Sequence, residues 1–143
     1  MNTELVSIVT PAYNAQAFIS ATIDSVLAQT YSNWEHLIVI DCNSKDRTEE
    51  IVQEYARKDP RVKCIKSPLA KGAAANRNTA LAMAKGTFIA FVDADDLWVP
   101  QKLEKQLAFM EKNNYDFTYT AFTRISEDGS SLGMTLPAKK REL

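Results

Sequence analysis

Short apolar runs alternate along this chain with stretches in which apolar residues recur at helical spacing. The runs that we interpret as strands lie at residues 6–10, 34–40, 62–65, 88–92 and 117–122. Alternation of strands with helices is typical of βαβ units, whose strands run parallel within one sheet. The sequence therefore predicts an α/β fold with a mostly parallel central sheet, formed by one domain over residues 1–143.

Helices are predicted in the four intervals between these strands. They are expected near residues 19–27, 44–58, 72–84 and 100–113. Asn43 or Ser44 is expected to cap the second helix, and Gly86 is expected to stop the third from the C′ position. Pro100 is expected to open the fourth helix. A turn-prone segment at residues 126–131 predicts a hairpin after the last strand.

The composition excludes several classes of protein. Hydrophobic residues make up 45% of the chain and charged residues 24%, which is ordinary for a soluble globular domain. A net charge of −1 gives no electrostatic reason to expect nucleic acid as the main partner. No apolar run approaches the roughly 20 residues that a membrane-spanning helix needs. With His36 as the one histidine, His-based metal sites and Ser-His triads have little to work with.

The cysteines and the chain ends predict where the protein acts. Cys42 and Cys64 form no Cys-x-x-Cys motif, so we interpret them as free thiols in a reducing cytoplasm. The first residues do not have the basic region and apolar core of a signal peptide. A basic cluster, Lys139 to Arg141, is interpreted as a solvated end. Contact of this cluster with the inner face of the cell membrane is the alternative.

Three carboxylates follow the fourth predicted strand directly. The run 88–92 is interpreted as buried, and it leads into Asp93, Asp95 and Asp96. On a continued strand Asp93 and Asp95 would project to the same side, as two oxygen ligands for Mg²⁺ or Mn²⁺ should. The simpler alternative is that Asp95 or Asp96 caps the helix near Pro100. Three carboxylates in four positions favour a metal or nucleotide site.

Polar, turn-prone residues also follow the first and second strands. Because the carboxyl ends of parallel strands meet at one edge of a sheet, these segments are expected to share a crevice with Asp93 and Asp95. Tyr13 offers an aromatic face, and Asp41 offers a carboxylate to a ribose or a base. Singly, Tyr13 reads as a half-buried core tyrosine and Asp41 as a turn or cap residue. Their conjunction favours a nucleoside diphosphate site.

The segment 71–78 adds a fourth element to this site. It opens a helix without bulky side chains, which lets backbone approach a ligand or the sheet closely. Arg77 could pair with a phosphate or with the carboxylates after the fourth strand, and Asn78 lies beside it. Tight helix–sheet packing with an ordinary ion pair explains the segment equally well. The chain has no P-loop and no Gly-x-Gly-x-x-Gly motif.

Together these segments resemble the N-terminal half of an inverting family 2 glycosyltransferase. The resemblance extends over about residues 5–122 and rests on segments that follow the family order, namely 6–14, 25–31, 41–48, 71–78 and 91–100. In finer detail the chain is similar to bacterial transferases that build teichuronic acid, capsule or other surface polysaccharides. The resemblance implies the A-type glycosyltransferase fold, a three-layer Rossmann-like architecture that binds nucleotide-diphospho-sugars.

The resemblance also implies a UDP-sugar donor, a saccharide or lipid-linked acceptor, and Mn²⁺ or Mg²⁺. By position, Pro11 and Tyr13 would flank the uracil. Asp93 would approach the ribose, and Asp95 would ligate the metal that bridges the diphosphate. The candidate metal ligands are Asp95 and Asp93. The candidate donor-binding residues are Pro11, Ala12, Tyr13, Asp41, Cys42, Gly72, Arg77, Asn78, Asp93 and Ala94.

The chain departs from the family pattern in two places. Cys42 stands where the family has the aspartate that hydrogen-bonds the uracil, and a thiol is a poor acceptor. The acidic general base expected well after Asp95 is also not found. Glu127 and Asp128 are the nearest candidates, but they lie in a predicted turn. We therefore expect a donor-binding domain truncated before its acceptor-binding half. The alternatives are a nucleotidyltransferase and a non-catalytic binding module of the same fold.

Overall fold

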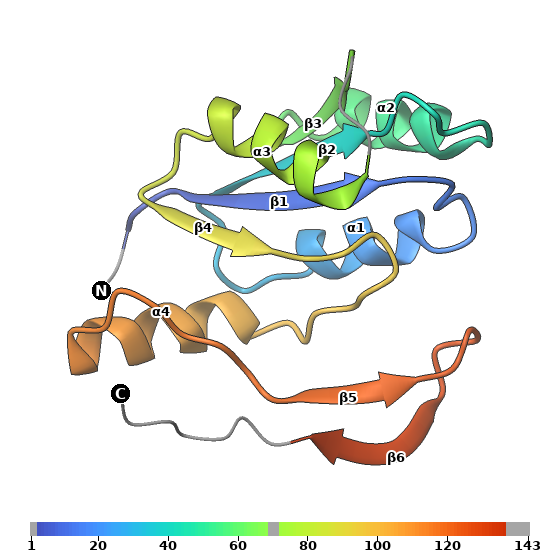
Figure 1. The fold of residues 1–143 in the computed structure, drawn as a ribbon. Helices are drawn as coiled ribbons and strands as arrows, with labels where there is room; N and C mark the ends of the chain where they lie inside the picture. Colours follow the sequence, from blue (N-terminus) through green and yellow to red (C-terminus); the bar gives the residue numbers. More distant parts are fainter. Residues whose placement is uncertain (1–2, 69–71, 137–143) are drawn as a thin grey trace.

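The computed structural model describes residues 3–68 and 72–136 and contains one four-stranded sheet. The strands are β1 (Val6–Ala12), β2 (Trp34–Ile40), β3 (Val62–Lys66) and β4 (Phe88–Phe91). Their order is β3-β2-β1-β4, and every neighbouring pair is parallel (Figure 1). The predicted α/β fold with a parallel central sheet is confirmed. The strands β1 and β2 occupy its centre and are almost completely buried.

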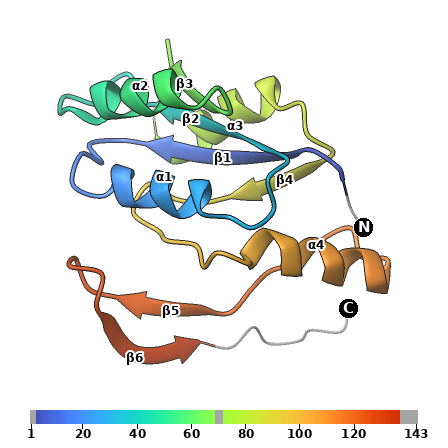
Figure 2. The same ribbon diagram turned by 180° about the vertical axis from the view of Figure 1, so that it is seen from behind.

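Three helices cover the two faces of the sheet, and a fourth follows β4. They are α1 (Ile19–Leu27), α2 (Thr48–Lys58), α3 (Ala73–Met83) and α4 (Lys102–Asn113). Helix α3 packs on β1 and β2 from the front in Figure 1, whereas α1 is in front of the sheet in Figure 2. Helices α1 and α2 contact each other on that second face. None of these helices has the length and apolar character needed to cross a bilayer.

The alternation of side chains along β1 and β2 divides the core into two layers. The larger layer lies against α1, α2 and α4 and includes Val6, Ile8, Ile19, Ile23, Val26, Trp34, Ile38, Val52, Leu103 and Leu107. The smaller layer contains Val9, Leu37 and Val39 packed against Ala80 of α3. Each fully buried aliphatic side chain contributes about 1.5–3 kcal/mol to folding. This double burial fixes the register of the central strands, and with it the position of their carboxyl ends.

Gly86 has a different role from the predicted helix stop. Helix α3 ends at Met83, and its C-cap residue Ala84 has an extended backbone, so the helix ends before Gly86. A Cβ atom on Gly86 would lie 2.5 Å from the backbone nitrogen of Ser7 and 2.7 Å from the carbonyl oxygen of Leu5. The residue is a glycine because the chain passes directly against β1 before β4 begins.

Strand β4 is an edge strand, and the prediction that it is buried is wrong in part. Phe88 and Ala90 pack against the larger core layer, and Val92, the residue after the strand, is 3% exposed. Ile89 and Phe91 point to the other face, where they are 39% and 52% exposed. An apolar run cannot distinguish a central strand from an edge strand, because both have at least one covered face.

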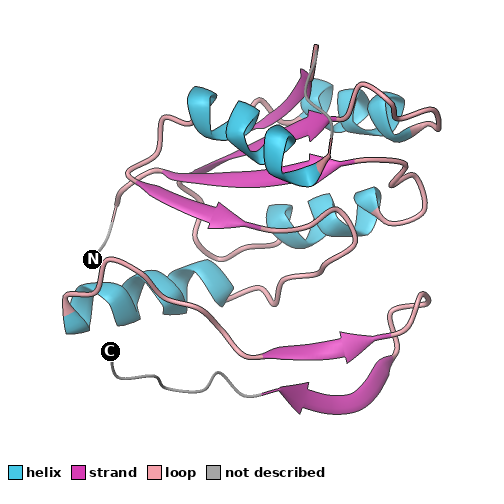
Figure 3. Ribbon diagram, viewed as in Figure 1, coloured by secondary structure: helices cyan, strands magenta, loops and turns pink. Residues whose placement is uncertain are grey.

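The predicted fifth strand is displaced along the chain. Residues 117–121 are loop, and the strand β5 (Phe122–Ile125) pairs antiparallel with β6 (Ser131–Leu136) instead of joining the sheet (Figure 3). The predicted hairpin turn is confirmed, with the backbone nitrogen of Ser126 donating to the carbonyl oxygen of Ser130 at 2.9 Å. Both views place this hairpin apart from the sheet, on the side of β4 (Figures 1 and 2).

Two helix starts also differ from the prediction. Helix α2 begins at Thr48, so neither Asn43 nor Ser44 is its cap. The Asp46 carboxylate instead accepts a hydrogen bond from the backbone nitrogen of Thr48 at 3.0 Å. Helix α4 begins at Lys102, two residues after Pro100. The basic cluster Lys139 to Arg141 lies outside the described residues.

Candidate functional site

The carboxyl ends of β1, β2 and β4 lie at the same edge of the sheet as the N-terminus of α3 (Figure 1). A cavity of about 320 Å³ opens at this edge. Its walls come from the loop after β1, the first turns of α3 and the turn after β4. The lining residues are Pro11, Tyr13, Asn14, Ala15, Phe18, Ala73, Arg77, Asp93, Ala94 and Asp95. Another hollow, of about 310 Å³, lies on α2 and contains no predicted site residue.

The carboxylates after β4 reach the cavity through a turn and not through a continued strand. Strand β4 stops at Phe91, and the backbone nitrogen of Asp96 donates to the carbonyl oxygen of Asp93 at 3.1 Å. The premise that Asp93 and Asp95 alternate along a strand is therefore wrong, yet both line the cavity. Neither Asp95 nor Asp96 caps α4, because that helix begins at Lys102 and has no side-chain cap.

Polar side chains from α1 and the residues after it hold this turn in place. The Thr22 hydroxyl donates to the carbonyl oxygen of Ala94 at 3.0 Å. Further along, the Gln29 side chain donates to the carbonyl oxygen of Val99 at 2.8 Å and accepts from the backbone nitrogen of Leu103 at 3.1 Å. These bonds fix the long segment between β4 and α4 (Figure 3). They also explain why the motif 25–31 accompanies the carboxylates in the sequence.

Negative charge is concentrated at the turn after β4. The guanidinium of Arg77 pairs with the Asp93 carboxylate at 2.6 Å, from α3 across the cavity wall. Burial, together with the charges of Asp95 and Asp93, raises the pKa of Asp96. Carboxylate oxygens under mutual repulsion are suitable ligands for a hard divalent cation. Among the residues that the structure describes, no cluster of three or more His, Cys, Asp or Glu could hold a metal alone.

Tyr13 also lines the cavity, on a loop whose backbone is held by hydrogen bonds. Its side chain is 60% exposed, so it is not a core tyrosine. The next residue, Asn14, has a φ of 44°, a left-handed conformation that asparagine tolerates. Its backbone nitrogen donates to the Ser44 hydroxyl at 3.0 Å, and its side-chain oxygen accepts from the backbone nitrogen of Lys45 at 2.9 Å. The loops after β1 and β2 are therefore joined beside Tyr13.

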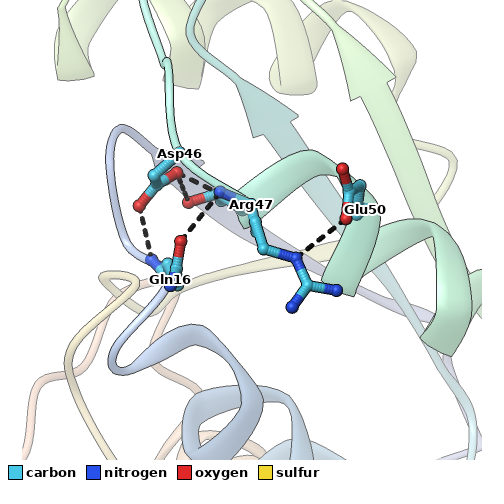
Figure 4. A network of polar contacts seen from close by, with 5 residues as sticks. Gln16, Asp46, Arg47 and Glu50 are labelled. Atoms are coloured by element: carbon cyan, nitrogen blue, oxygen red, sulfur yellow. Dashed lines mark hydrogen bonds and ion pairs between the residues drawn. The ribbon is translucent and has the colours of Figure 1, made fainter.

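Asp46 extends this connection between the two loops. Its carboxylate accepts from the backbone nitrogen of Gln16 at 3.0 Å, and the Gln16 side chain accepts from the backbone nitrogen of Arg47 at 3.0 Å (Figure 4). Burial opposes ionisation of Asp46, but hydrogen bonds from Thr48 and Gln16 outweigh it and lower the pKa of this carboxyl. The exposed ion pair between Arg47 and Glu50 at the edge of this network contributes little to stability.

The other predicted site residues are not on the cavity wall. Asp41 is buried, and hydrogen bonds from the backbone nitrogens of Asn43 and Gly72 hold the pKa of its carboxyl below the usual range. Ala12 belongs to the core, whereas Cys42, Gly72 and Asn78 are exposed. Lys71, at the start of the fourth segment, lies outside the described residues.

Four wall residues were missed by the sequence analysis: Asn14, Ala15, Phe18 and Ala73. Ala15 and Phe18 follow Tyr13 in the same loop, and Ala73 follows Gly72. The available signal was their adjacency to residues that were predicted. Ala15 is also held in place by a hydrogen bond, which its backbone nitrogen donates to the Thr48 hydroxyl at 2.8 Å.

A family model described as Glycosyl transferase family 2 matches residues 7–141, nearly the whole chain. The chain belongs to glycosyl transferase family 2. The family resemblance read from the motifs is thereby confirmed. One curated relative, from Escherichia coli, is named UDP-Glc:alpha-D-GlcNAc-diphosphoundecaprenol beta-1,3-glucosyltransferase WfgD. It is 50% identical over 128 residues, which cover 90% of this chain and 49% of the relative.

Two solved structures share the fold of this family 2 chain. One is S. aureus TarS 1-349 in complex with UDP-GlcNAc, with a TM-score of 0.70 and 31% identity over 76% of this chain and 32% of that one. The other is the mannosyltransferase PcManGT from Pyrobaculum calidifontis with GDP-Man and Mn²⁺, with a TM-score of 0.66 and 28% identity over 87% of this chain and 36% of that one. This chain spans about half the length of WfgD and of two other curated relatives that it matches.

Proposed function

We propose that this chain is the donor-binding part of an inverting, metal-dependent glycosyltransferase. Its donor would be a UDP-sugar, and its acceptor a lipid-linked saccharide or growing polysaccharide of the bacterial cell envelope. The observation that carries the proposal is the cavity in which Tyr13, Arg77, Asp93 and Asp95 meet at the sheet edge. Family membership supports it, as do the donor and acceptor in the name of the WfgD relative. That acceptor also favours action at the inner face of the membrane.

Each wall of the cavity would hold a different part of the donor. Pro11 and the exposed ring of Tyr13 would flank the uracil, which needs an apolar, flat surface. Asp93 would accept a hydrogen bond from the ribose, with its carboxylate oriented by Arg77. Arg77 is also within the wall that the phosphates would face, where its guanidinium offers donors in a fixed geometry.

A divalent metal fits the carboxylate oxygens at the turn after β4. Asp95, with Asp93 beside it, would hold Mn²⁺ or Mg²⁺ and leave the remaining coordination positions to phosphate oxygens and water. When bound, the ion would neutralise charge on the departing diphosphate. PcManGT, a structural relative, was solved with Mn²⁺. Burial is the main reason that the pKa of Asp96 is raised, and the charges of Asp95 and Asp93 add to it; a cation would relieve this second contribution.

The isolated chain is expected to bind the donor better than it transfers the sugar. In the complete reaction a carboxylate would deprotonate the acceptor hydroxyl, which then attacks the sugar C1 from the side opposite the diphosphate. Asp128 is unsuited to this role, because hydrogen bonds from Ser126 and Ser130 lower the pKa of its carboxyl to about 2. Glu127 lies in the same hairpin turn and does not line the cavity. The base and the acceptor site would therefore belong to a part of the enzyme beyond this chain.

Cys42 favours one other candidate function, a non-catalytic nucleotide-binding module of the same fold. Its thiol is exposed directly after β2, where a carboxylate would read the uracil. A nucleotidyltransferase finds less support, because the loop after β1 contains Pro11 and Tyr13 in place of a glycine-rich basic segment. Transfer activity of the whole enzyme would separate the catalytic and non-catalytic alternatives.

Calorimetry of UDP binding tests the proposal. We expect UDP to bind more tightly in Mn²⁺ than in EDTA, and Asp95→Ala to remove most of that difference. The matched control is Asp116→Ala, which removes an exposed carboxylate just after α4 and away from the cavity, and should leave the metal effect intact. Equal affinity of the unaltered chain for UDP with and without metal would contradict the metal assignment. Absence of UDP binding in both conditions would contradict the proposed function.

A further inference from the structure

The Asp41 carboxylate accepts four hydrogen bonds next to the cavity, yet it is not part of the cavity wall. Asp41 as a whole is only 4% exposed. One carboxylate oxygen accepts from the backbone nitrogen of Asn43 at 2.9 Å and from the Asn43 side chain at 3.2 Å. The other accepts from the backbone nitrogen of Gly72 at 2.8 Å and from the side chain of Asn76 at 2.8 Å. Both oxygens are thus engaged inside the protein.

Two of these donors belong to the start of α3. Gly72 is the N-cap residue of that helix, and its φ of 84° allows its N–H to turn toward β2. Asn76 lies one turn further on and is 1% exposed. Its side-chain oxygen has no hydrogen-bond partner among the described residues, so the bond to Asp41 is what fixes this buried amide. Asp41 therefore ties the end of β2 to the first turn of α3.

The first turns of α3 bear two residues of the cavity wall. Ala73 follows Gly72, and Arg77 follows Asn76. Arg77 in turn pairs with Asp93 at 2.6 Å. A continuous chain of contacts thus leads from the Asp41 carboxylate, through Gly72 and Asn76, to the guanidinium and the carboxylate that face the cavity.

We propose that Asp41 is a positioning residue, which sets the place of Arg77 and Asp93 from behind the site and does not contact the donor. This inference rests on the proposed function and deepens it, because it assigns the carboxylate after β2 to the protein framework. Uracil and ribose would then be recognised by other residues of the site. Loss of the Asp41 carboxylate would weaken binding of the nucleotide-sugar because the N-terminus of α3 is displaced. No direct contact with the nucleotide-sugar would be removed.

The pairing of Asp41 with Asn76 allows a swap experiment. In Asp41→Asn, an NH2 group replaces one carboxylate oxygen and faces N–H groups that previously donated to that oxygen. We therefore expect the affinity for UDP in Mn²⁺ to fall about tenfold. In Asn76→Asp, two carboxylates would face each other, and we expect a similar loss. The double variant Asp41→Asn/Asn76→Asp restores one donor and one acceptor across the pair. We expect it to recover most of the lost affinity, which a carboxylate in direct contact with UDP would not allow.

Hydrogen exchange without nucleotide supplies the second readout. The amide protons of Gly72 and Arg77 should exchange faster in Asp41→Asn than in the unaltered chain. In the double variant the Arg77 amide should slow again, whereas the Gly72 amide should stay fast, because the NH2 group at residue 41 cannot accept from it. The matched control is Asp59→Asn, which removes a carboxylate that accepts hydrogen bonds from Arg61 before β3, at the opposite edge of the sheet. It should leave both UDP affinity and exchange at α3 unchanged.

The outcomes separate this inference from the proposed function. If the unaltered chain fails to bind UDP, the proposed function is contradicted, while exchange at Gly72 and Arg77 still decides whether Asp41 positions α3. If UDP binds but the double variant remains as weak as Asp41→Asn, Asp41 contacts the donor directly and the inference is overturned. Unchanged exchange at α3 in Asp41→Asn would also overturn it.

Discussion

The one histidine of the chain makes its stability measurably dependent on pH. His36 lies in the middle of β2, opposite Ile8 of β1 and Val62 of β3, and is completely buried. Its Nε2 atom lies 2.7 Å from the Thr10 hydroxyl, and its Nδ1 atom has no hydrogen-bond partner among the described residues. Burial of a group that would be charged lowers the pKa of His36 to about 3. The imidazole is therefore neutral in the folded protein at every pH near neutrality.

The sign and size of the effect follow from this shift. Below about pH 6.5 the unfolded chain binds a proton at His36 and the folded chain does not, so the free energy of unfolding falls as the pH falls. Between pH 7.5 and 5.0 we expect a loss of about 2 kcal/mol, a large part of a typical stability. Asp41 and Asp46 contribute little in this range, because their stabilisation is lost only as the pH falls toward the pKa of an unfolded carboxyl, about 3.9.

Urea unfolding at several pH values between 7.5 and 5.0 measures this loss. A one-dimensional NMR titration measures its cause, because the single imidazole gives an isolated resonance that should not shift in the folded protein down to pH 5. Thr10→Val is the matched control: it removes the hydrogen bond but not the burial, and should lower stability while keeping the pH window. A folded-state resonance that titrates with a midpoint near 6.5 would refute the reasoning, as would a flat stability over this range.

Three further predictions concern the fold and the donor site. Gly86→Ala should lower the free energy of unfolding by about 2 kcal/mol or more, since the new Cβ would clash with the backbone of Ser7. A loss below about 0.5 kcal/mol in urea unfolding would contradict this contact. Cys42→Asp should tighten UDP binding by roughly 10- to 100-fold and leave ADP binding unchanged, because a charge-assisted hydrogen bond to uracil is gained. Equal gains in affinity for both nucleotides would show that residue 42 does not recognise the base. The unaltered chain should hydrolyse UDP-sugars slowly and transfer sugar far more slowly than the usual 1–10³ s⁻¹ of enzymes, and multiple-turnover transfer in that range would place the base within these residues.

The sequence was sufficient for the centre of the sheet because β1 and β2 are long and apolar and are followed by turn residues. The strand predicted at 34–40 has the bounds of β2, and its complete burial is what a run such as Leu37 to Ile40 indicates. The strand predicted at 117–122 failed for a different reason. Its alternating aromatic and threonine residues suit a strand, but a strand also needs a neighbour, and Phe117 and Tyr119 remain 79% and 53% exposed.

The positions of the candidate site residues were predictable where they depend only on the sheet edge. Tyr13, Asp93 and Asp95 follow strands, and strand ends converge in any parallel sheet. The role of Asp41 could not be read in the same way, because it depends on where α3 begins in space. Gly86 was also ambiguous, since a glycine after a helix fits a helix stop as well as a close approach between backbones. Both cases require distances between segments far apart in the sequence.

The most direct test of the central claim is an anomalous diffraction map of crystals grown with UDP and Mn²⁺. The account predicts a manganese peak at coordination distance from an Asp95 carboxylate oxygen, shared with the diphosphate, and the uracil ring against Tyr13. A manganese peak at another place, or UDP ordered outside the cavity at the ends of β1 and β4, would contradict the account.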